Sequence, residues 1–251
     1  MSLKHRLHPS LPRLPNFTDA ARQLRSLCAS LGLSMALALG LALGLVSLAR
    51  AEGHVAPLPD PAIGNALAAK PGKETAVFAG GCFWGVEAVF LHVKGVLSST
   101  SGYAGGSAAS ASYEAVSTGQ TGHAEAVQVV FDPSVVSYGQ LLKVFFSAAH
   151  NPTQLNYQGP DHGTQYRSAI FTTTPEQSRA ATAYIKQLEA AKVFRAPIVT
   201  QVGSLPRFFT AEPYHLNYLA RNMTQPYIVI NDLPKLAALE KDFPKLYRKP
   251  K

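Results

Sequence analysis

Beyond residue 74, short apolar runs alternate with stretches in which apolar residues recur every three or four positions. The short runs are β-branched or alternate apolar with polar positions, as strands do. They predict strands at 75–79, 96–103, 122–131, 167–173 and 198–202, followed by a Phe208-Phe209 segment. The helical spacing predicts helices after residue 82, from residue 137, over 175–192 and shortly after residue 209. This alternation indicates an α+β or α/β domain with one sheet and helices packed on it.

Cys82 lies on the turn between the first predicted strand and the first predicted helix. The helix is indicated by apolar residues at helical spacing, with Gly95 at its expected end, namely Val86, Val89, Phe90 and Val93. The first turn of a helix favours negative charge, so a thiol there can ionise below its usual pKa of about 8.5. Two glycines before the cysteine let the backbone bend and let a substrate approach. The alternative is a buried structural cysteine.

A carboxyl group is predicted on the apolar face of the strand at 122–131. Apolar residues alternate along this strand at period two, at Val127, Val129 and Phe131. Glu125 shares their parity, so burial should raise its pKa and suit it to act as a general acid. The alternative is a carboxylate that reaches water at the strand end. His123 is a candidate base for Cys82, or else a histidine that faces solvent or packs on a loop.

The remaining candidates are polar residues in glycine-rich loops and an aromatic pair beside the cysteine. Tyr113, Asp161 and Tyr166 can line a polar pocket or pack on the surface. Phe83 and Trp84 can belong to the core or to a pocket wall. Three further histidines lack the spacing of metal ligands, and we assign no metal, namely His150, His162 and His215.

The first 51 residues have the pattern of an export signal. Basic residues and prolines precede an uncharged Leu/Ala/Gly-rich run at 27–49, and Ala49-Arg50-Ala51 follows as a small-x-small cleavage pattern. We therefore expect a signal peptide at 1–51 and an exported, periplasmic domain. The apolar run is also long enough to be an uncleaved membrane anchor. We expect a flexible Pro/Ala/Gly linker at 52–74, a catalytic domain at 75–225 and a C-terminal tail at 226–251.

Charge and cysteine content narrow the function classes. The formal net charge of the 251 residues is +8, and residues 1–50 hold six Lys/Arg and one Asp, so the remainder is only mildly basic. Without a basic run with interleaved aromatics, we expect no nucleic-acid partner. Because Cys28 lies in the predicted leader, the mature domain should hold one thiol, which excludes a disulfide framework and a cysteine-rich metal site.

Three motifs in order resemble the A-type peptide methionine sulfoxide reductases (MsrA). They are Gly81-Cys82-Phe83-Trp84-Gly85-Val86-Glu87, Gly122-His123-Ala124-Glu125-Ala126-Val127 and Asp161-His162-Gly163-Thr164-Gln165-Tyr166-Arg167-Ser168. The resemblance runs from about Thr75 to about Leu219. It implies an α+β two-layer sandwich, with a mixed sheet and packed helices in a ferredoxin-like arrangement. It also implies reduction of the S epimer of methionine sulfoxide, peptide-bound and free, without a bound cofactor.

The resemblance carries roles onto this chain residue by residue. Cys82 matches the nucleophile that attacks the sulfoxide sulfur, and Glu125 matches the acid that protonates the oxygen. Phe83 and Trp84 match the pocket for the substrate methyl group. The remaining matches are to polar groups around the sulfoxide oxygen, and they are Tyr113, Tyr166 and Asp161.

The chain departs from many family members because no cysteine follows Cys82. The Cys82 sulfenic acid expected after turnover must then be resolved by an external thiol reductant. A thioredoxin-like protein, a glutaredoxin-like protein or a small thiol can supply it. We expect a monomer that repairs oxidised exported proteins and meets the membrane only through the leader, if that is uncleaved.

Two other function classes remain to be compared with the reductase. A Cys82–His123 hydrolase or acyltransferase predicts that His123→Ala abolishes activity while Glu125→Gln has a mild effect. A non-catalytic thiol redox sensor or binding module predicts binding without turnover. The reductase predicts the reverse ranking of the two substitutions, and turnover with dithiothreitol.

Overall fold

The fold is built on a six-stranded mixed sheet. In this computed structural model, which describes residues 58–249, the strand order is β7-β6-β1-β3-β2-β8. All neighbours are antiparallel except β6 and β7, which run parallel. The strands are β1 Glu74–Gly80, β2 Val96–Ala104, β3 Ala124–Phe131, β6 Ser168–Thr172, β7 Gln201–Ser204 and β8 Phe208–Thr210, with a separate hairpin of β4 Tyr157–Gln158 and β5 Asp161–His162.

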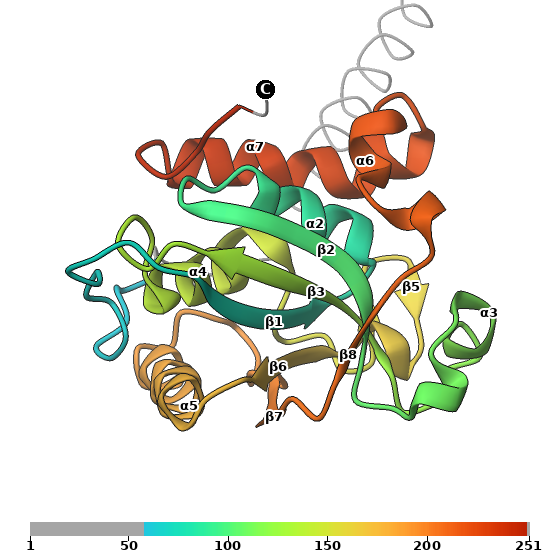
Figure 1. The fold of residues 1–251 in the computed structure, drawn as a ribbon, viewed down its shortest axis with the longest axis horizontal. Coiled ribbons are helices and arrows are strands. Elements are labelled where there is room, and N and C mark those ends of the chain that lie inside the picture. Colours follow the sequence, from blue (N-terminus) through green and yellow to red (C-terminus); the bar gives the residue numbers. More distant parts are fainter. Residues whose placement is uncertain (1–57, 250–251) are drawn as a thin grey trace, which may run out of the picture. The chain divides into compact units, whose positions relative to one another are not determined.

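Helices and short helical turns lie between the strands and follow the last strand, β8 (Figure 1). The α-helices are α2 Phe83–Leu91, α3 Tyr113–Val116, α4 Tyr138–Val144, α5 Pro175–Ala190, α6 Tyr218–Arg221 and α7 Leu233–Asp242. The 3-10 turns are η1 Ala108–Ser110, η3 Thr164–Tyr166 and η4 Pro213–His215, and the π-helical turns are η2 Phe145–Ala149 and η5 Ile228–Asp232. The predicted α+β class, with a mixed sheet and packed helices, is confirmed.

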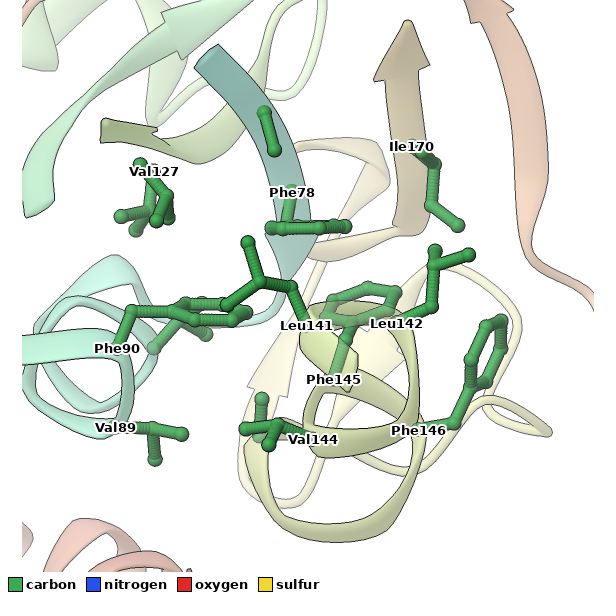
Figure 2. Packing of buried hydrophobic residues seen from close by; sticks show 14 of the residues in the cluster. Phe78, Val89, Phe90, Val127, Leu141, Leu142, Val144, Phe145, Phe146 and Ile170 are labelled. Atoms are coloured by element: carbon green, nitrogen blue, oxygen red, sulfur yellow. The ribbon is translucent and has the colours of Figure 1, made fainter. Parts of the chain in front are cut away.

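The main core lies between one face of the sheet and the helices. Phe78 of β1 stacks between Phe90 of α2 and Phe145 of η2, with ring centroids 4.9 Å and 5.0 Å away. Figure 2 shows these rings together with Leu141 and Ile170. The opposite face carries a smaller cluster of mostly small side chains, namely Val77, Ala79, Ala104, Ala124, Ala126, Ala169 and Phe171. Successive residues of β1 thus enter opposite clusters, as strand geometry requires.

Local sequence signals start two of the helices as predicted. Ser137 caps α4 with a capping box, because its hydroxyl accepts from the Gln140 N–H and the Gln140 side chain accepts from the Ser137 N–H. Thr174 caps α5 through the Gln177 N–H, and Pro175 occupies the first helical position. Helix α2 ends at Leu91, before the expected Gly95, which instead takes a positive φ of 88° in the turn that precedes β2.

The prediction of a linker at 52–74 is wrong for residues 58–73, which pack on the domain. Leu58 belongs to the main core and is 4% exposed. The carbonyl of Pro59 accepts a hydrogen bond from the Tyr184 hydroxyl, and the Asp60 carboxylate pairs with Lys143 at 2.8 Å. These contacts join positions far apart in sequence, so local composition did not reveal them. Residues 52–57 and the predicted leader at 1–51 lie outside the described residues.

The prediction of a C-terminal tail at 226–251 is also wrong. Ile228 and Leu239 are fully buried, and α7 packs against α2. The domain therefore extends well beyond residue 225. Within residues 58–249, no helix combines the length and apolar content that crossing a membrane requires.

Candidate active site

All the side chains predicted for the site except His123 line one pocket of about 300 Å³. Cys82 lies between β1 and α2. It is the N-cap residue of α2. The lining residues come from six separate segments of the chain, and they are Cys82, Phe83, Trp84, Tyr113, Glu125, Asp161, Tyr166, Gln225 and Tyr227. The fold thus gathers residues that are more than 140 positions apart in sequence.

Glu125 is fixed beside the start of α2. It lies opposite Tyr103 in the β2–β3 register and is 2% exposed. Its Oε2 accepts a hydrogen bond of 3.0 Å from the Phe83 backbone N–H, which directly follows Cys82 in the chain. The Glu125 carboxyl group and the Cys82 thiol therefore lie at the same end of α2.

Burial raises the pKa of Glu125 to about 8, and the nearby Asp161 carboxylate adds to the increase. The hydrogen bond from Phe83 opposes the shift without cancelling it. Glu125 therefore carries a proton at neutral pH, as its parity with the apolar face of β3 predicted, and it can donate that proton.

The expectation that the helix end brings Cys82 close to neutral ionisation is wrong. Burial raises the pKa of the Cys82 thiol well above its ordinary value, and the carboxylates of Glu125 and Asp232 act in the same direction. The backbone N–H of Trp84 and the Lys235 ammonium favour the thiolate, but desolvation outweighs them. Protonated Glu125 does not oppose the thiolate, so the acid form of Glu125 and the ionisation of Cys82 are compatible.

Phe83 and Trp84 form the apolar wall of the pocket. Phe83 is buried against Tyr103, with ring centroids 5.9 Å apart. Trp84 is partly buried, and its ring stacks on Tyr218 at 3.8 Å with an interplanar angle of 11°. Its indole N–H donates to His215, which also contacts the Phe83 ring. This wall is apolar on the pocket side and is held by aromatic and hydrogen-bond contacts behind it.

Tyr113, Tyr166 and Asp161 form the polar part of the lining. Tyr113 begins α3, Tyr166 ends η3 and Asp161 lies in β5. Burial raises the pKa of both tyrosines, with Glu125 adding to the shift, so both hydroxyls keep their protons and can donate them in hydrogen bonds. Burial also raises the pKa of Asp161, against the effect of a hydrogen bond from the Tyr227 hydroxyl.

His123 does not line the pocket. It is buried, its Nδ1 accepts from the Gly106 N–H at 3.2 Å, and its Nε2 lies 2.9 Å from the Ser107 carbonyl oxygen. Because Nδ1 accepts, Nε2 carries the proton and donates to Ser107. Both ring nitrogens thus hold a loop, which leaves neither free to deprotonate Cys82.

Sequence reasoning missed the residues that the C-terminal region brings to the site. Gln225 and Tyr227 line the pocket, and His215 supports its apolar wall. The useful signal was the helical spacing of Ile228, Leu236 and Leu239, which indicates a helix with one face on the core. Among residues 58–249, no group of three or more His, Cys, Asp or Glu side chains could hold a metal.

Comparison with known proteins identifies the family. The family model of peptide methionine sulfoxide reductase matches residues 74–247. The chain is 60% identical over 179 residues to peptide methionine sulfoxide reductase MsrA 2 of Mesorhizobium japonicum, covering 71% of this chain and 92% of that protein. The chain therefore belongs to the peptide methionine sulfoxide reductase family, in its MsrA branch, and reduces methionine sulfoxide.

Solved structures agree with this assignment. Reduced Mxr1 of Saccharomyces cerevisiae is 31% identical, with a TM-score of 0.56, over 61% of this chain and 87% of that chain. Methionine sulfoxide reductase A of Corynebacterium diphtheriae is 37% identical, with a TM-score of 0.53, over 68% of this chain and 87% of that chain. The matched region of the family model reaches residue 247, which agrees with a domain that continues through α7.

Proposed function

We propose that the pocket reduces the S epimer of methionine sulfoxide, peptide-bound or free, with Cys82 as nucleophile and Glu125 as proton donor. The observation that carries this is the pairing of Cys82 with a buried, protonated Glu125 in a pocket that has an apolar aromatic wall. A sulfoxide oxygen leaves poorly until it gains protons, so an acid aimed at it lowers the barrier.

In the first half-reaction Cys82 loses its proton and its sulfur bonds to the sulfoxide sulfur. Glu125 gives its proton to the oxygen and regains one from the thiol. Tyr113 and Tyr166 donate hydrogen bonds to the oxygen as its charge grows, and Asp161 supports this polar side. The substrate sulfur then loses both its new bond to Cys82 and its bond to oxygen, the hydroxyl passes to the Cys82 sulfur, and methionine leaves while Cys82 remains as a sulfenic acid. The thiol sulfur is oxidised and the sulfoxide sulfur is reduced, so atoms and electrons balance.

Epimer choice follows from the shape of the pocket. The methyl group of the sulfoxide fits the apolar wall of Phe83 and Trp84, while the oxygen faces Glu125 and the tyrosines. With the methyl group and oxygen placed in this way, the lone pair and the remaining chain occupy fixed directions. The opposite epimer would have to turn either its oxygen toward the rings or its methyl group toward the polar side, which leaves polar groups unpaired.

The second half-reaction uses an external thiol, because no cysteine follows Cys82 in the sequence. One thiol attacks the sulfenic sulfur and releases water, and a second thiol breaks the mixed disulfide and restores Cys82. A thioredoxin-like protein, a glutaredoxin-like protein or a small thiol meets this requirement. Each cycle consumes one sulfoxide and two thiols, and yields methionine, a disulfide and water.

We also propose that the protein is exported, through the leader at 1–51, and repairs oxidised proteins there. Sequencing the N-terminus of the protein recovered from cells distinguishes cleavage near Ala51 from an intact anchor. Recovery of the protein in the cytosolic fraction with residues 1–51 still present would contradict export.

The function is tested by following the separate S and R epimers of a methionine sulfoxide peptide with dithiothreitol as reductant. Consumption of the S epimer alone is expected. Consumption of the R epimer alone, or of neither, would overturn the proposal. His123→Ala serves as the comparison for the hydrolase alternative, and it should retain more activity than Glu125→Gln, because both nitrogens of His123 hold the loop at 106–107.

A further inference from the structure

An ion pair with a fully buried carboxylate and a partly exposed ammonium lies against the first turn of α2. The Asp232 side chain is 0% exposed, and its Oδ1 lies 3.0 Å from the Lys235 Nζ, whose side chain is 21% exposed. A Cβ atom on Gly85 would lie 2.1 Å from that oxygen and 2.8 Å from that nitrogen. The helix approaches both charges because residue 85 has no side chain.

Stability alone gives a poor account of this pair. The second carboxylate oxygen of Asp232, Oδ2, is buried and has no hydrogen-bond partner among the described residues. A buried ion pair with an unsatisfied oxygen is often no more stable than apolar side chains of the same size. Its position therefore calls for a role other than holding α7 to α2.

The pair lies beside the helix end that carries the thiol. Cys82 is the N-cap of α2, and Gly85 is three residues further on, so both belong to the first turn of the helix. The two charges act on Cys82 in opposite directions, since the carboxylate opposes the thiolate and the ammonium favours it. The other groups that face Cys82 or its pocket come from β3, β5, α3, η3 and the segment before η5, and they are Glu125, Asp161, Tyr113, Tyr166 and Tyr227.

We propose that Asp232 and Lys235 are positioning residues of opposite sign, which together set how readily Cys82 gives up its proton. This rests on the proposed role of Cys82 as the nucleophile. Lys235 supplies positive charge at the first turn of α2, behind a pocket whose lining is acidic and phenolic, and Asp232 fixes that ammonium against the helix while limiting its effect.

The test is the pH dependence of Cys82 alkylation by iodoacetamide, measured on the full chain in a Cys28→Ser background. This readout needs no sulfoxide turnover, so it can fail or succeed independently of the proposed function. Asp232→Asn should move the alkylation midpoint to lower pH, and Lys235→Gln should move it to higher pH, each by about one pH unit. Lys235→Arg keeps the positive charge and should leave the midpoint near that of the wild type.

The opposite signs separate charge from structure. Both Asp232→Asn and Lys235→Gln break the same ion pair, so loosened packing alone would move the two midpoints in the same direction. Shifts in the same direction, or no shift in either variant, would overturn the proposal. If Asp232→Asn does not fold, the alkylation midpoints of Lys235→Gln and Lys235→Arg still test the proposal. Equal midpoints in these two variants would contradict it. Glu176→Gln, which breaks the exposed Glu176–Arg179 pair of the same spacing, is the matched control and should change nothing.

Discussion

Trp84 donates a hydrogen bond from its indole Nε1 to Nδ1 of His215, over 3.1 Å. His215 is 2% exposed, and burial lowers its pKa, so the ring is neutral and its proton resides on Nε2. The His215 ring also lies 5.0 Å from the Phe83 ring and 4.4 Å from the Tyr113 ring. One histidine outside the pocket thus holds three of the side chains that line it.

Replacing His215 should loosen the apolar wall more than it slows the chemistry. In His215→Phe the indole N–H loses its acceptor, which costs about 1 kcal/mol and should raise KM roughly fivefold with a smaller change in kcat. The ratio of kcat/KM for a methyl sulfoxide to kcat/KM for an ethyl sulfoxide should decrease as well. His215→Asn, which keeps an oxygen acceptor, should lie between this variant and the wild type.

The fluorescence of the protein reports the same contact, because Trp84 is its single tryptophan. Emission should shift in His215→Phe without unfolding, which far-ultraviolet circular dichroism can verify. Unchanged emission together with unchanged KM would show that His215 does not hold Trp84.

Glu125→Gln should remove the general acid and lower kcat by about 10²–10⁴-fold. In the wild type, kcat/KM should fall as pH rises through about 8, since burial raises the pKa of Glu125 to that value and only the acid form donates. This basic limb should be absent from the residual activity of Glu125→Gln. If the activity of the variant falls with the same midpoint, the ionisation that causes the fall belongs to a group other than Glu125.

The same substitution should stabilise the protein at alkaline pH. Folded Glu125 has a raised pKa of about 8, so its contribution to stability is present below its unfolded pKa and is lost as pH rises through about 8. Glu125→Gln cannot ionise, and its free energy of unfolding should exceed that of the wild type by a few kcal/mol at pH 9, an order of magnitude that follows from the shift. Urea unfolding at pH 5 and pH 9 measures this difference, which should be small at the lower pH.

Tyr227→Phe should weaken the polar side of the pocket. The Tyr227 hydroxyl donates to the Asp161 carboxylate, and its loss should raise the pKa of Asp161 further. Because this hydrogen bond fixes the Asp161 carboxylate in the lining of the pocket, activity should fall roughly tenfold when it is lost. Tyr247→Phe, remote from the pocket, is the control, and an equal effect there would remove the assignment to Asp161.

Much of the site could be predicted from local patterns. The parity of Glu125 with Val127 and Phe131 placed it on the buried face, and burial alone then gave the direction of its pKa shift. The strand, turn and helix around Cys82 likewise follow from apolar spacing. These predictions succeed because each depends on neighbours within one element.

The rest depended on contacts between distant segments. Leu58 and Leu239 are core residues, yet each lies in a stretch whose composition indicates a linker or a tail. The helix-end argument for Cys82 gave the correct sign for the backbone contribution, but the larger effect of burial comes from surrounding elements that the local sequence does not show. His215 and Tyr227 acquire their roles only through partners more than 60 positions away.

The most direct test of the account is a single turnover with no thiol present. The Cys28→Ser protein is mixed with excess methionine S-sulfoxide, and both the methionine released and the mass of the Cys82 peptide are measured. One methionine per protein, with one oxygen atom gained at Cys82, is the predicted result. Methionine formed without oxygen on Cys82, or formed equally by a Cys82→Ser variant, would contradict it.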